Sequence, residues 1–320
     1  MSLGSLRPSY ESINYTIRPA KSIERKMLVE SFRLLWPFGP VEKYTYVGFG
    51  STFFVDFSLV HRSLGITDLL SIEKDVEKKE RFEFNRPFKC IRLDLRPSTQ
   101  VLPELNWTKK TIVWLDYDGK LSDHVLADIG FFFDLAPSGS VLVISLNANP
   151  GQRSKRMKQL HDRIQDSTKI PADTSPDTLE EWGTAETYYR IITNEINESL
   201  ARRNGVLETA DKLTYRQLYN FYYSDTAKMF TVGGVLHSAR DSEQFERCQF
   251  ASKLDFIKSG SDPYLLFVPS LTLRELQSLD KQLPCGGTEA LAAAGVPTSD
   301  LQTYRRIYRY YPRFTESELW

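Results

Sequence analysis

The apolar positions in the first half of the chain follow two different periodicities. Short continuous apolar runs, typical of strands buried on both faces, occur at YTYVGF, DLLSI, KCIRLDL, TIVWLDY and SVLVISL. Between them, apolar residues recur at helical spacing in VDFSLVHRSLG, VEKKERFEFN and HVLADIGFFFDLA. A further helix is predicted from Ser22 to Trp36, with Ser22 as its N-cap. Strands that alternate with helices predict an α/β fold with a doubly wound, mostly parallel sheet.

The pattern changes after Pro150. GQRSKRMKQLHDRI predicts a basic helix, and DTLEEWGTAETYYRIITNEINESLARRNG predicts a long amphipathic helix that ends at Gly205. KMFTVGGVLHSA and PYLLFVPS predict two strands that return to the edge of the sheet. We therefore expect an N-terminal arm with a leading helix at residues 1–40 and a Rossmann-like core at residues 41–150. A helical insertion at residues 151–225, edge strands at residues 226–270 and a helical extension at residues 271–320 should follow.

Composition narrows the classes of partner. The 320 residues include 41 basic and 41 acidic side chains, so no overall field favours nucleic acid or an anionic membrane, although a local basic face stays open. Cys90, Cys248 and Cys285 lie far apart and form no CxxC pair, which argues against a zinc site or a disulfide framework. No apolar run reaches the length of a membrane span, and the N-terminus has no signal-peptide pattern. The sequence therefore predicts a cytoplasmic protein.

Two glycines, Gly48 and Gly50, follow the first predicted strand in VGFGS. In open α/β sheets the ligand lies beyond the carboxyl ends of the strands, and this turn forms the floor of its site. A dinucleotide fingerprint has a third glycine, which lets the helix approach a pyrophosphate, but this chain has Phe53 at that position. The turn therefore favours a nucleoside ligand without phosphate over a nicotinamide cofactor, and a purely structural turn is the alternative.

Acidic residues follow three further predicted strands. Glu73 ends the second strand, where a carboxylate can accept hydrogen bonds from both hydroxyls of a ribose. Asp94 ends the third strand, where an acid or its neighbouring backbone can meet an adenine amino group. Asp116 and Asp118 follow the fourth strand in LDYDGK, so their carboxylates emerge from the core into a cleft. Either could act as a base, orient a substrate or hold a cation; Asp118 with Gly119 could instead make the turn into the next helix.

The succession of VGFGS, SIEKD, RLDL and VWLDYDG resembles motifs one to four of the class I S-adenosylmethionine-dependent methyltransferases. Residues from about 14 to 150 are similar to a bacterial family described as O-methyltransferases, particularly at NYTIRPAKSIERKML, which contains Arg18, Lys21 and Glu24. The resemblance implies methyl transfer from S-adenosylmethionine to oxygen. It implies that the two glycines line the methionine part, that Glu73 binds the ribose and that Asp94 meets the adenine. The cofactor-binding set is then Gly48, Gly50, Ser51, Glu73, Lys74, Asp94 and Asp116, and the catalytic residues are Asp116 and Asp118.

One position departs from the methyltransferase pattern. Many of these enzymes carry an acid two residues before the first glycine, where it helps to hold the methionine ammonium, and this chain has Tyr46. Asp56 or Asp116 would have to take that role, or the affinity for the cofactor would be low. The departure favours the alternative function, a non-catalytic adenosyl-ligand-binding or regulatory module of a bacterial modification or defence system.

The metal and the acceptor are less defined. DYDGK followed by SLNANPG resembles metal-dependent catechol-type O-methyltransferases, in which Asn147 and Asn149 would supply oxygens, but the expected second aspartate is absent. A divalent cation therefore stays open without being favoured. The Asn/Asp-Pro-Pro-Tyr/Phe signature of amino-methylating nucleic-acid enzymes is also missing. A small-molecule acceptor is favoured, a nucleic acid stays open, no membrane partner is indicated, and the sequence does not define the oligomeric state.

Overall fold

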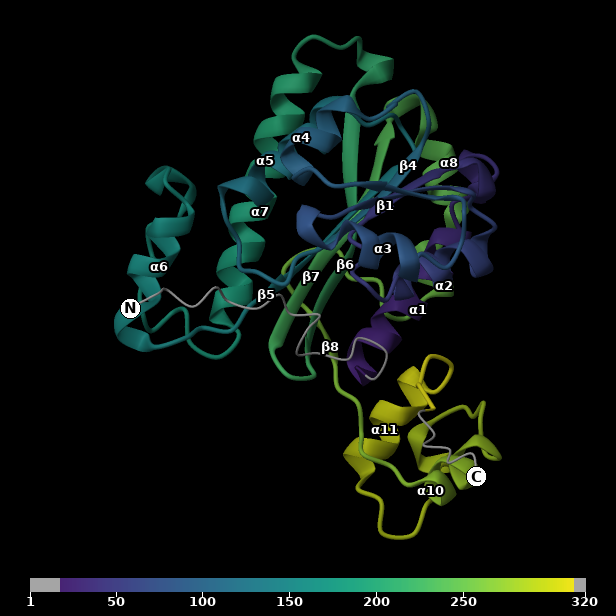
Figure 1. Cartoon of the computed structure of the whole chain (residues 1–320). Helices are drawn as coiled ribbons and strands as arrows, with labels where there is room; N and C mark the ends of the chain where they lie inside the picture. Colours follow the sequence, from purple (N-terminus) through teal and green to yellow (C-terminus); the bar gives the residue numbers. More distant parts are fainter. Residues whose placement is uncertain (1–17, 314–320) are drawn as a thin grey trace.

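The computed structural model describes residues 18–313, and one eight-stranded sheet forms its centre (Figure 1). The strand order is β3-β2-β1-β4-β5-β7-β6-β8. The first five strands are parallel, β7 is antiparallel to both β5 and β6, and β8 is parallel to β6. The strands are β1 (Thr45–Gly48), β2 (Asp68–Ile72), β3 (Ile91–Asp94), β4 (Thr111–Asp116), β5 (Ser140–Asn147), β6 (Leu213–Ser224), β7 (Lys228–Ser238) and β8 (Tyr264–Leu266). The mostly parallel, doubly wound α/β sheet is confirmed, and its strand order reverses between β1 and β4.

Helices cover both faces of the sheet. One face packs against α1 (Pro19–Arg33), α2 (Val55–Leu64), α3 (Lys79–Asn85), α8 (Ser242–Cys248) and α9 (Phe250–Lys253). The other packs against α4 (Ser98–Val101), α5 (Asp123–Leu135), α6 (Arg156–Arg163) and α7 (Gly183–Asn204). Along β4, Ile112 and Trp114 join the first core while Val113 and Leu115 join the second. Because β4 is buried on both faces, its sequence is a continuous apolar run.

Helix α1 begins earlier than the sequence pattern indicates. It starts at Pro19, and Ser22 lies inside its first turn rather than at its N-cap. The backbone N–H groups of Ala20 and Lys21 donate to the carboxylate of Asp225, at 2.9 and 3.1 Å. Asp225 lies in the turn between β6 and β7. The acceptor that satisfies the start of this helix is therefore supplied by a distant segment, which no local pattern indicates.

The sheet also extends further back along the chain than the expected boundary at residue 225. Strand β6, Leu213–Ser224, falls in the segment that the sequence assigned to the helical insertion. Residues 218–223, mostly aromatic, are buried, and the strand itself lies between β7 and β8 in the sheet. Strand β7 pairs with β5 as well as β6, so of the strands expected to form the edge only β8 lies there.

A small C-terminal lobe follows β8 and contains α10 (Leu273–Asp280) and α11 (Thr298–Ile307), drawn in yellow-green and yellow in Figure 1. It has its own apolar cluster, in which the rings of Tyr304 and Tyr311 meet at 5.2 Å. The lobe is attached to α1 where the Lys26 ammonium donates to the carbonyl of Tyr310, at 2.8 Å. Its tyrosines therefore serve packing. Within residues 18–313, no helix is both long enough and apolar enough to cross a membrane.

We expect Gly234→Ala to destabilise the protein. A Cβ at Gly234 would lie 2.2 Å from the carbonyl oxygen of Arg216, on the backbone of the neighbouring strand, so β6 and β7 would have to separate. Overpacking of this kind costs about 1–3 kcal/mol. Urea unfolding measures the change, with Gly119→Ala as the control, because a Cβ at Gly119 meets nothing within 4 Å. Equal midpoints for the two variants would contradict the close strand contact.

Candidate functional site

The loop after β1 is joined to the end of β2 by a buried carboxylate. The N–H of Gly50 donates to Oε1 of Glu73 at 2.8 Å and to Oγ of Ser71 at 3.0 Å, and the Ser71 hydroxyl donates to the same Glu73 oxygen at 2.9 Å. Burial raises the pKa of Glu73 to about 7, although the hydrogen bonds from Ser71, Gly50 and Ser51 act in the opposite direction. This acid is therefore fixed against the glycine loop and titrates in the neutral range.

Both glycines of the loop are required by the packing of the protein itself. A Cβ at Gly48 would lie 2.8 Å from the carbonyl oxygen of Trp114, and a Cβ at Gly50 would lie 2.6 Å from Oγ of Ser71 and 2.7 Å from the ring of Phe54. Phe54 is fully buried beneath the loop. The protein's own packing therefore requires glycine at both positions of the turn, whichever ligand the turn binds. Because the Gly50 amide already points at a carboxylate, a pyrophosphate at this position would meet negative charge, which disfavours a dinucleotide.

Helix α1 places a buried ammonium at the end of β4. The side chain of Lys21 is 0 % exposed, and its Nζ lies 2.7 Å from Oε2 of Glu24 and 2.8 Å from Oδ1 of Asp116. Glu24 also accepts hydrogen bonds from Tyr223, at 3.0 Å, and from Thr231. The carboxylate of Asp116 is therefore held from α1, while Glu24 connects the same ammonium to β6 and β7.

The charges of Asp56 and Asp116, the two acids that could replace the missing one, both act on Tyr46. Arg25 of α1 is ion-paired with Asp56. Burial, followed by the charges of Asp56 and Asp116, raises the pKa of Tyr46 far above its usual range, so its phenol stays neutral. Burial lowers the pKa of Arg25, but Asp56, Asp116 and Glu24 more than compensate and raise it. Each candidate acid near Tyr46 is thus matched by a cation of α1, which is Arg25 for Asp56 and Lys21 for Asp116.

Tyr117 and Asp118, the two residues after Asp116, have different surroundings. The hydroxyl of Tyr117 donates to the buried carboxylate of Asp128, and its ring packs edge-on against Phe49 of the glycine loop, at 5.1 Å. Asp118 is exposed, and its charge contributes to the raised pKa of Glu73. The structure therefore brings together the loop after β1, the end of β2 and the loop after β4. Of the neighbouring sequence-predicted residues, Ser51 is half-buried and Lys74 is exposed.

Asp94 is turned away from this group. Its carboxylate accepts from Nε and Nη2 of Arg96, at 3.0 and 2.7 Å, and the hydrogen bonds from Arg96 lower its pKa. It lines a hollow of about 320 Å³ together with Thr45, Asp68 and Thr111, which begin β1, β2 and β4. The Asp94 backbone contacts the site, because its carbonyl accepts from the N–H of Glu73 at 2.9 Å.

The two asparagines after β5 organise that loop. Oδ1 of Asn147 accepts from the N–H of Asn149 at 2.9 Å, and Oδ1 of Asn149 accepts from the N–H of Lys228 at 3.0 Å. Both side-chain oxygens thus hold backbone in place. Across the described part of the chain, no three His, Cys, Asp or Glu side chains are grouped so that they could hold a metal ion.

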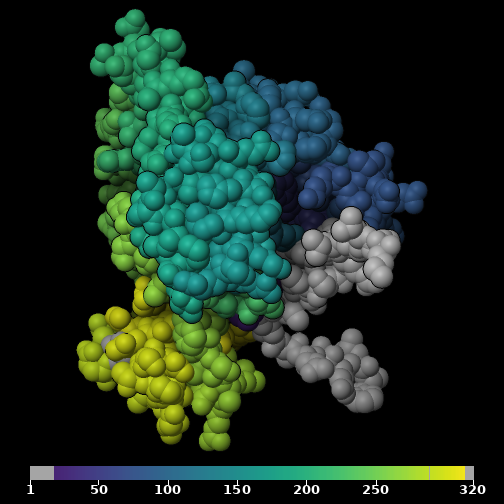
Figure 2. Space-filling view, turned by 90° about the vertical axis from the view of Figure 1, so that its left-hand side faces the viewer, coloured from purple at the N-terminus to yellow at the C-terminus, as the bar shows by residue number. Residues whose placement is uncertain are grey.

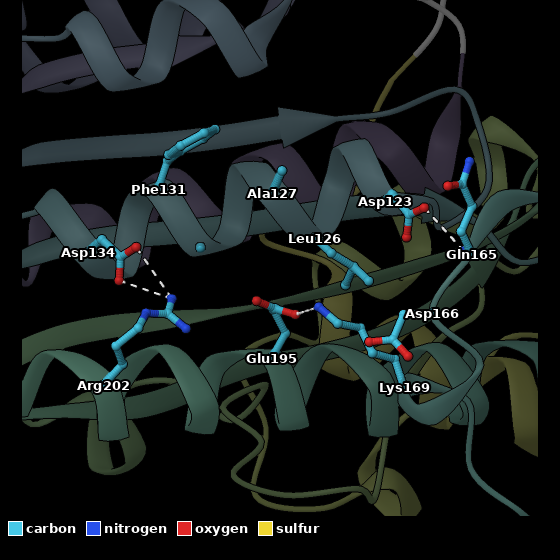
Figure 3. Close-up of a pocket in the computed structure, with 11 residues that line it drawn as sticks. Asp123, Leu126, Ala127, Phe131, Asp134, Gln165, Asp166, Lys169, Glu195 and Arg202 are labelled. Carbon is cyan, nitrogen blue, oxygen red and sulfur yellow. Dashed lines mark hydrogen bonds and ion pairs between the residues drawn. The ribbon is translucent and has the colours of Figure 1, made fainter.

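A larger hollow, of about 550 Å³, lies between α5 and α7 and is separate from the site (Figure 3). Arg202 of α7 is ion-paired with Asp134 of α5, and Lys169 of the segment between α6 and α7 is ion-paired with Glu195 of α7. None of the residues that line it belongs to the glycine loop or to the loop after β4. The hollow is therefore a gap between two helices, and charged side chains reach across it.

Sequence reasoning missed Ser71, Arg25 and Tyr223. Ser71 had a usable signal, because a residue two positions before Glu73 on a strand shares its face. Arg25 also had one, because charged residues within a helix expected to face the core call for buried partners. Tyr223 had none, since nothing local connects β6 with α1.

We expect Lys21→Met to lower the free energy of unfolding by about 3–5 kcal/mol, because it leaves the buried Glu24 and the half-buried Asp116 without their shared cation. Adding Glu24→Gln should recover part of this loss. Chemical denaturation compares both variants with Lys79→Met, which removes an ammonium whose side chain is 59 % exposed. A loss no larger than that of the control would show that the buried ion pairs contribute little.

The chain is similar to several solved structures and to one family of known proteins. One similar structure is Trm1 from Pyrococcus horikoshii with S-adenosyl-L-methionine, at 11% identity and a TM-score of 0.45, with 77% of this chain and 64% of that chain covered. A second is spermidine synthase from Thermotoga maritima, at 9% identity and a TM-score of 0.42, with 77% of this chain and 68% of that chain covered. A third is the N-methyltransferase NodS from Bradyrhizobium japonicum WM9, at 11% identity and a TM-score of 0.38, with 68% of this chain and 97% of that chain covered. No curated protein matches the chain. The family model described as "Putative O-methyltransferase" matches residues 13–319, which is nearly the whole sequence. The chain therefore belongs to this family, and it is an S-adenosylmethionine-dependent methyltransferase.

Proposed function

We propose that the protein transfers the methyl group of S-adenosylmethionine to an oxygen of a small acceptor, at the carboxyl ends of β4 and β5. The observation that carries the proposal is the buried Glu73 carboxylate fixed to the Gly50 amide, with Asp116 and Asp118 on the neighbouring loop. A carboxylate in this position suits ribose hydroxyls, and acids beside it suit a hydroxyl acceptor. The oxygen assignment rests on the family description.

The charges around Tyr46 fit the methionine end of the cofactor. The described cluster contains the cations Lys21 and Arg25 and the acids Glu24, Asp56 and Asp116, which makes two positive and three negative charges and a net charge of −1. S-adenosylmethionine carries a sulfonium, an ammonium and a carboxylate, a net charge of +1. The cluster therefore complements the cofactor without an acid at Tyr46. We place Ser51 and Lys74 beside the ribose, and the backbone that follows Asp94 beside the adenine.

The two acids after β4 take different roles in this proposal. Bound S-adenosylmethionine supplies an electrophilic methyl group, and transfer forms the acceptor O–C bond as the C–S bond breaks. The acceptor hydroxyl must lose its proton, and the exposed Asp118 is the base that we propose for it. Asp116 is held by Lys21, so we assign it to positioning beside the reacting methyl group.

A non-catalytic adenosyl-binding module is the second candidate, and the neutral Tyr46 favours it. Such a module would bind the cofactor without turning it over. Release of S-adenosylhomocysteine in the presence of an acceptor separates the two functions.

We expect Glu73→Ala to weaken S-adenosylmethionine binding at least tenfold, because hydrogen bonds to a charged group contribute about 1.5–3 kcal/mol each. Calorimetric titration with S-adenosylmethionine, S-adenosylhomocysteine and NAD measures the affinities. Glu77→Ala is the control, since Glu77 is an exposed acid of the same segment. Unchanged affinity in Glu73→Ala would refute the site, and binding of NAD would refute the function.

The affinity for S-adenosylmethionine should rise between pH 6 and pH 8. Glu73 has a pKa of about 7, raised from the ordinary value of 4.5, so below neutral pH its carboxyl group is largely protonated and must lose a proton before it accepts from two hydroxyls. The same shift makes folding less favourable as pH rises from about 4.5 to 7, because the folded protein holds this proton more tightly. Titrations at several pH values test the prediction, and Glu73→Gln should show weak binding without this pH dependence.

A further inference from the structure

Three cations gather beside the loop after β4. Nζ of Lys120 lies 3.5 Å from where a Cβ of Gly151 would stand, and Nε of Arg156 donates to the carbonyl of the same glycine at 3.3 Å. Burial lowers the pKa of Lys120, and the charges of Arg163 and Arg156 lower it further. Lys120, Arg156 and Arg163, which we call the cation cluster, therefore repel one another at close range.

The described residues neutralise the cation cluster only in part. Glu180 lies 4.0 Å from Arg156, but no described carboxylate lies within 4 Å of the Lys120 ammonium or the Arg163 guanidinium. Nε of Arg163 is buried and has no hydrogen-bond partner among the described residues. The Tyr188 hydroxyl interacts with the Arg163 side chain and with the backbone of Leu121, and both contacts oppose the rise of its pKa that burial causes. Buried donors without acceptors are costly, so this place is suited to a bound acceptor group.

In and just before α6, the positive charge that is not neutralised lies on the inner side of the helix. The exposed bases Arg153 and Lys158 are neutralised locally by Asp177 and Asp162, at 2.7 Å in each case. A nucleic-acid surface would need an open row of unpaired bases that follows a phosphate backbone. The arrangement fits a single anionic group instead.

The cation cluster borders the proposed reaction loop. Lys120 is two residues beyond Asp118, and the carbonyl of Gly119 accepts from the N–H of Asn147 at 2.9 Å, which joins the loops after β4 and β5. Figure 2 shows the molecule hollowed between the teal segment that contains α6 and the blue segments, with purple N-terminal residues deeper in the hollow. In sheets of this kind the ligands occupy this edge.

We propose that Lys120 and Arg163, supported by the charge of Arg156, bind an oxyanion of the methyl acceptor, a carboxylate or a phosphate. This inference rests on the proposed function, because it assigns the anion to the acceptor. It makes the acceptor a small anionic hydroxy compound, held at its charged end so that its hydroxyl lies near Asp118. Binding of the charged end is independent of the cofactor's own contacts with Glu73.

The test uses the full chain with S-adenosylhomocysteine and two probes, inorganic phosphate observed by ³¹P line broadening and ¹³C-labelled acetate observed by ¹³C line broadening. We expect saturable broadening for at least one probe, and the probe that broadens more identifies the acceptor group. Lys120→Gln and Arg163→Gln should each weaken the binding at least tenfold, and Arg163→Lys should recover part of it. Lys158→Gln, a base of the same helix whose side chain is 78 % exposed, is the matched control.

Absence of saturable broadening with both probes, or equal loss in Lys158→Gln, would overturn the inference. Calorimetric binding of S-adenosylmethionine is measured on the same variants and should not change. If the wild-type protein binds a probe but not S-adenosylmethionine, the proposed function fails while the anion site stands. If it binds S-adenosylmethionine but neither probe, only the anion site fails.

Discussion

The ammonium of Lys21, buried between Glu24 and Asp116, is the interaction on which the site depends. Burying Lys21 and Glu24 is costly unless each finds partners, so these side chains fix the position of α1 closely once the helix packs. Glu24 extends the constraint to Tyr223 and Thr231, and Asp225 satisfies the first turn of the same helix. Four separate segments, α1, β4, β6 and β7, are thereby locked together at one edge of the sheet.

The same arrangement gives the site its polarity. On the cofactor side, Tyr46 is surrounded by paired charges whose sum is slightly negative, and Glu73 adds a carboxyl group that ionises near neutral pH. On the other side of the loop after β4, the cation cluster holds three bases and only one described counter-charge, Glu180, which lies 4.0 Å from Arg156. In the proposed reaction a cationic cofactor and an anionic acceptor approach from opposite sides of this loop, and the field of the protein orders both.

Stability and function meet in the glycine loop. Gly48 and Gly50 are needed because Trp114, Ser71 and Phe54 leave no space for a Cβ. This packing fixes the Gly50 amide against Glu73, and a fixed carboxylate can present its charge to a ligand without reorganising. The glycines therefore act through the position of the acid beside them, and the buried ring of Phe54 packs against Gly50.

The sequence by itself determined the elements of the core and the acids at the ends of β2 and β4, because apolar periodicity and the run of residues along a strand are local properties. It also indicated the cofactor class, through the motifs around Gly48, Glu73 and Asp116 and the missing third glycine. Only the tertiary structure decided that Asp225 satisfies the start of α1, that β6 belongs to the sheet, and that Asp94 turns to Arg96. It also decided which base meets which acid, since Lys21 and Asp116 are far apart along the chain and meet only when α1 packs on the sheet. Long-range pairs of this kind depend on packing, and no local pattern of residues encodes them.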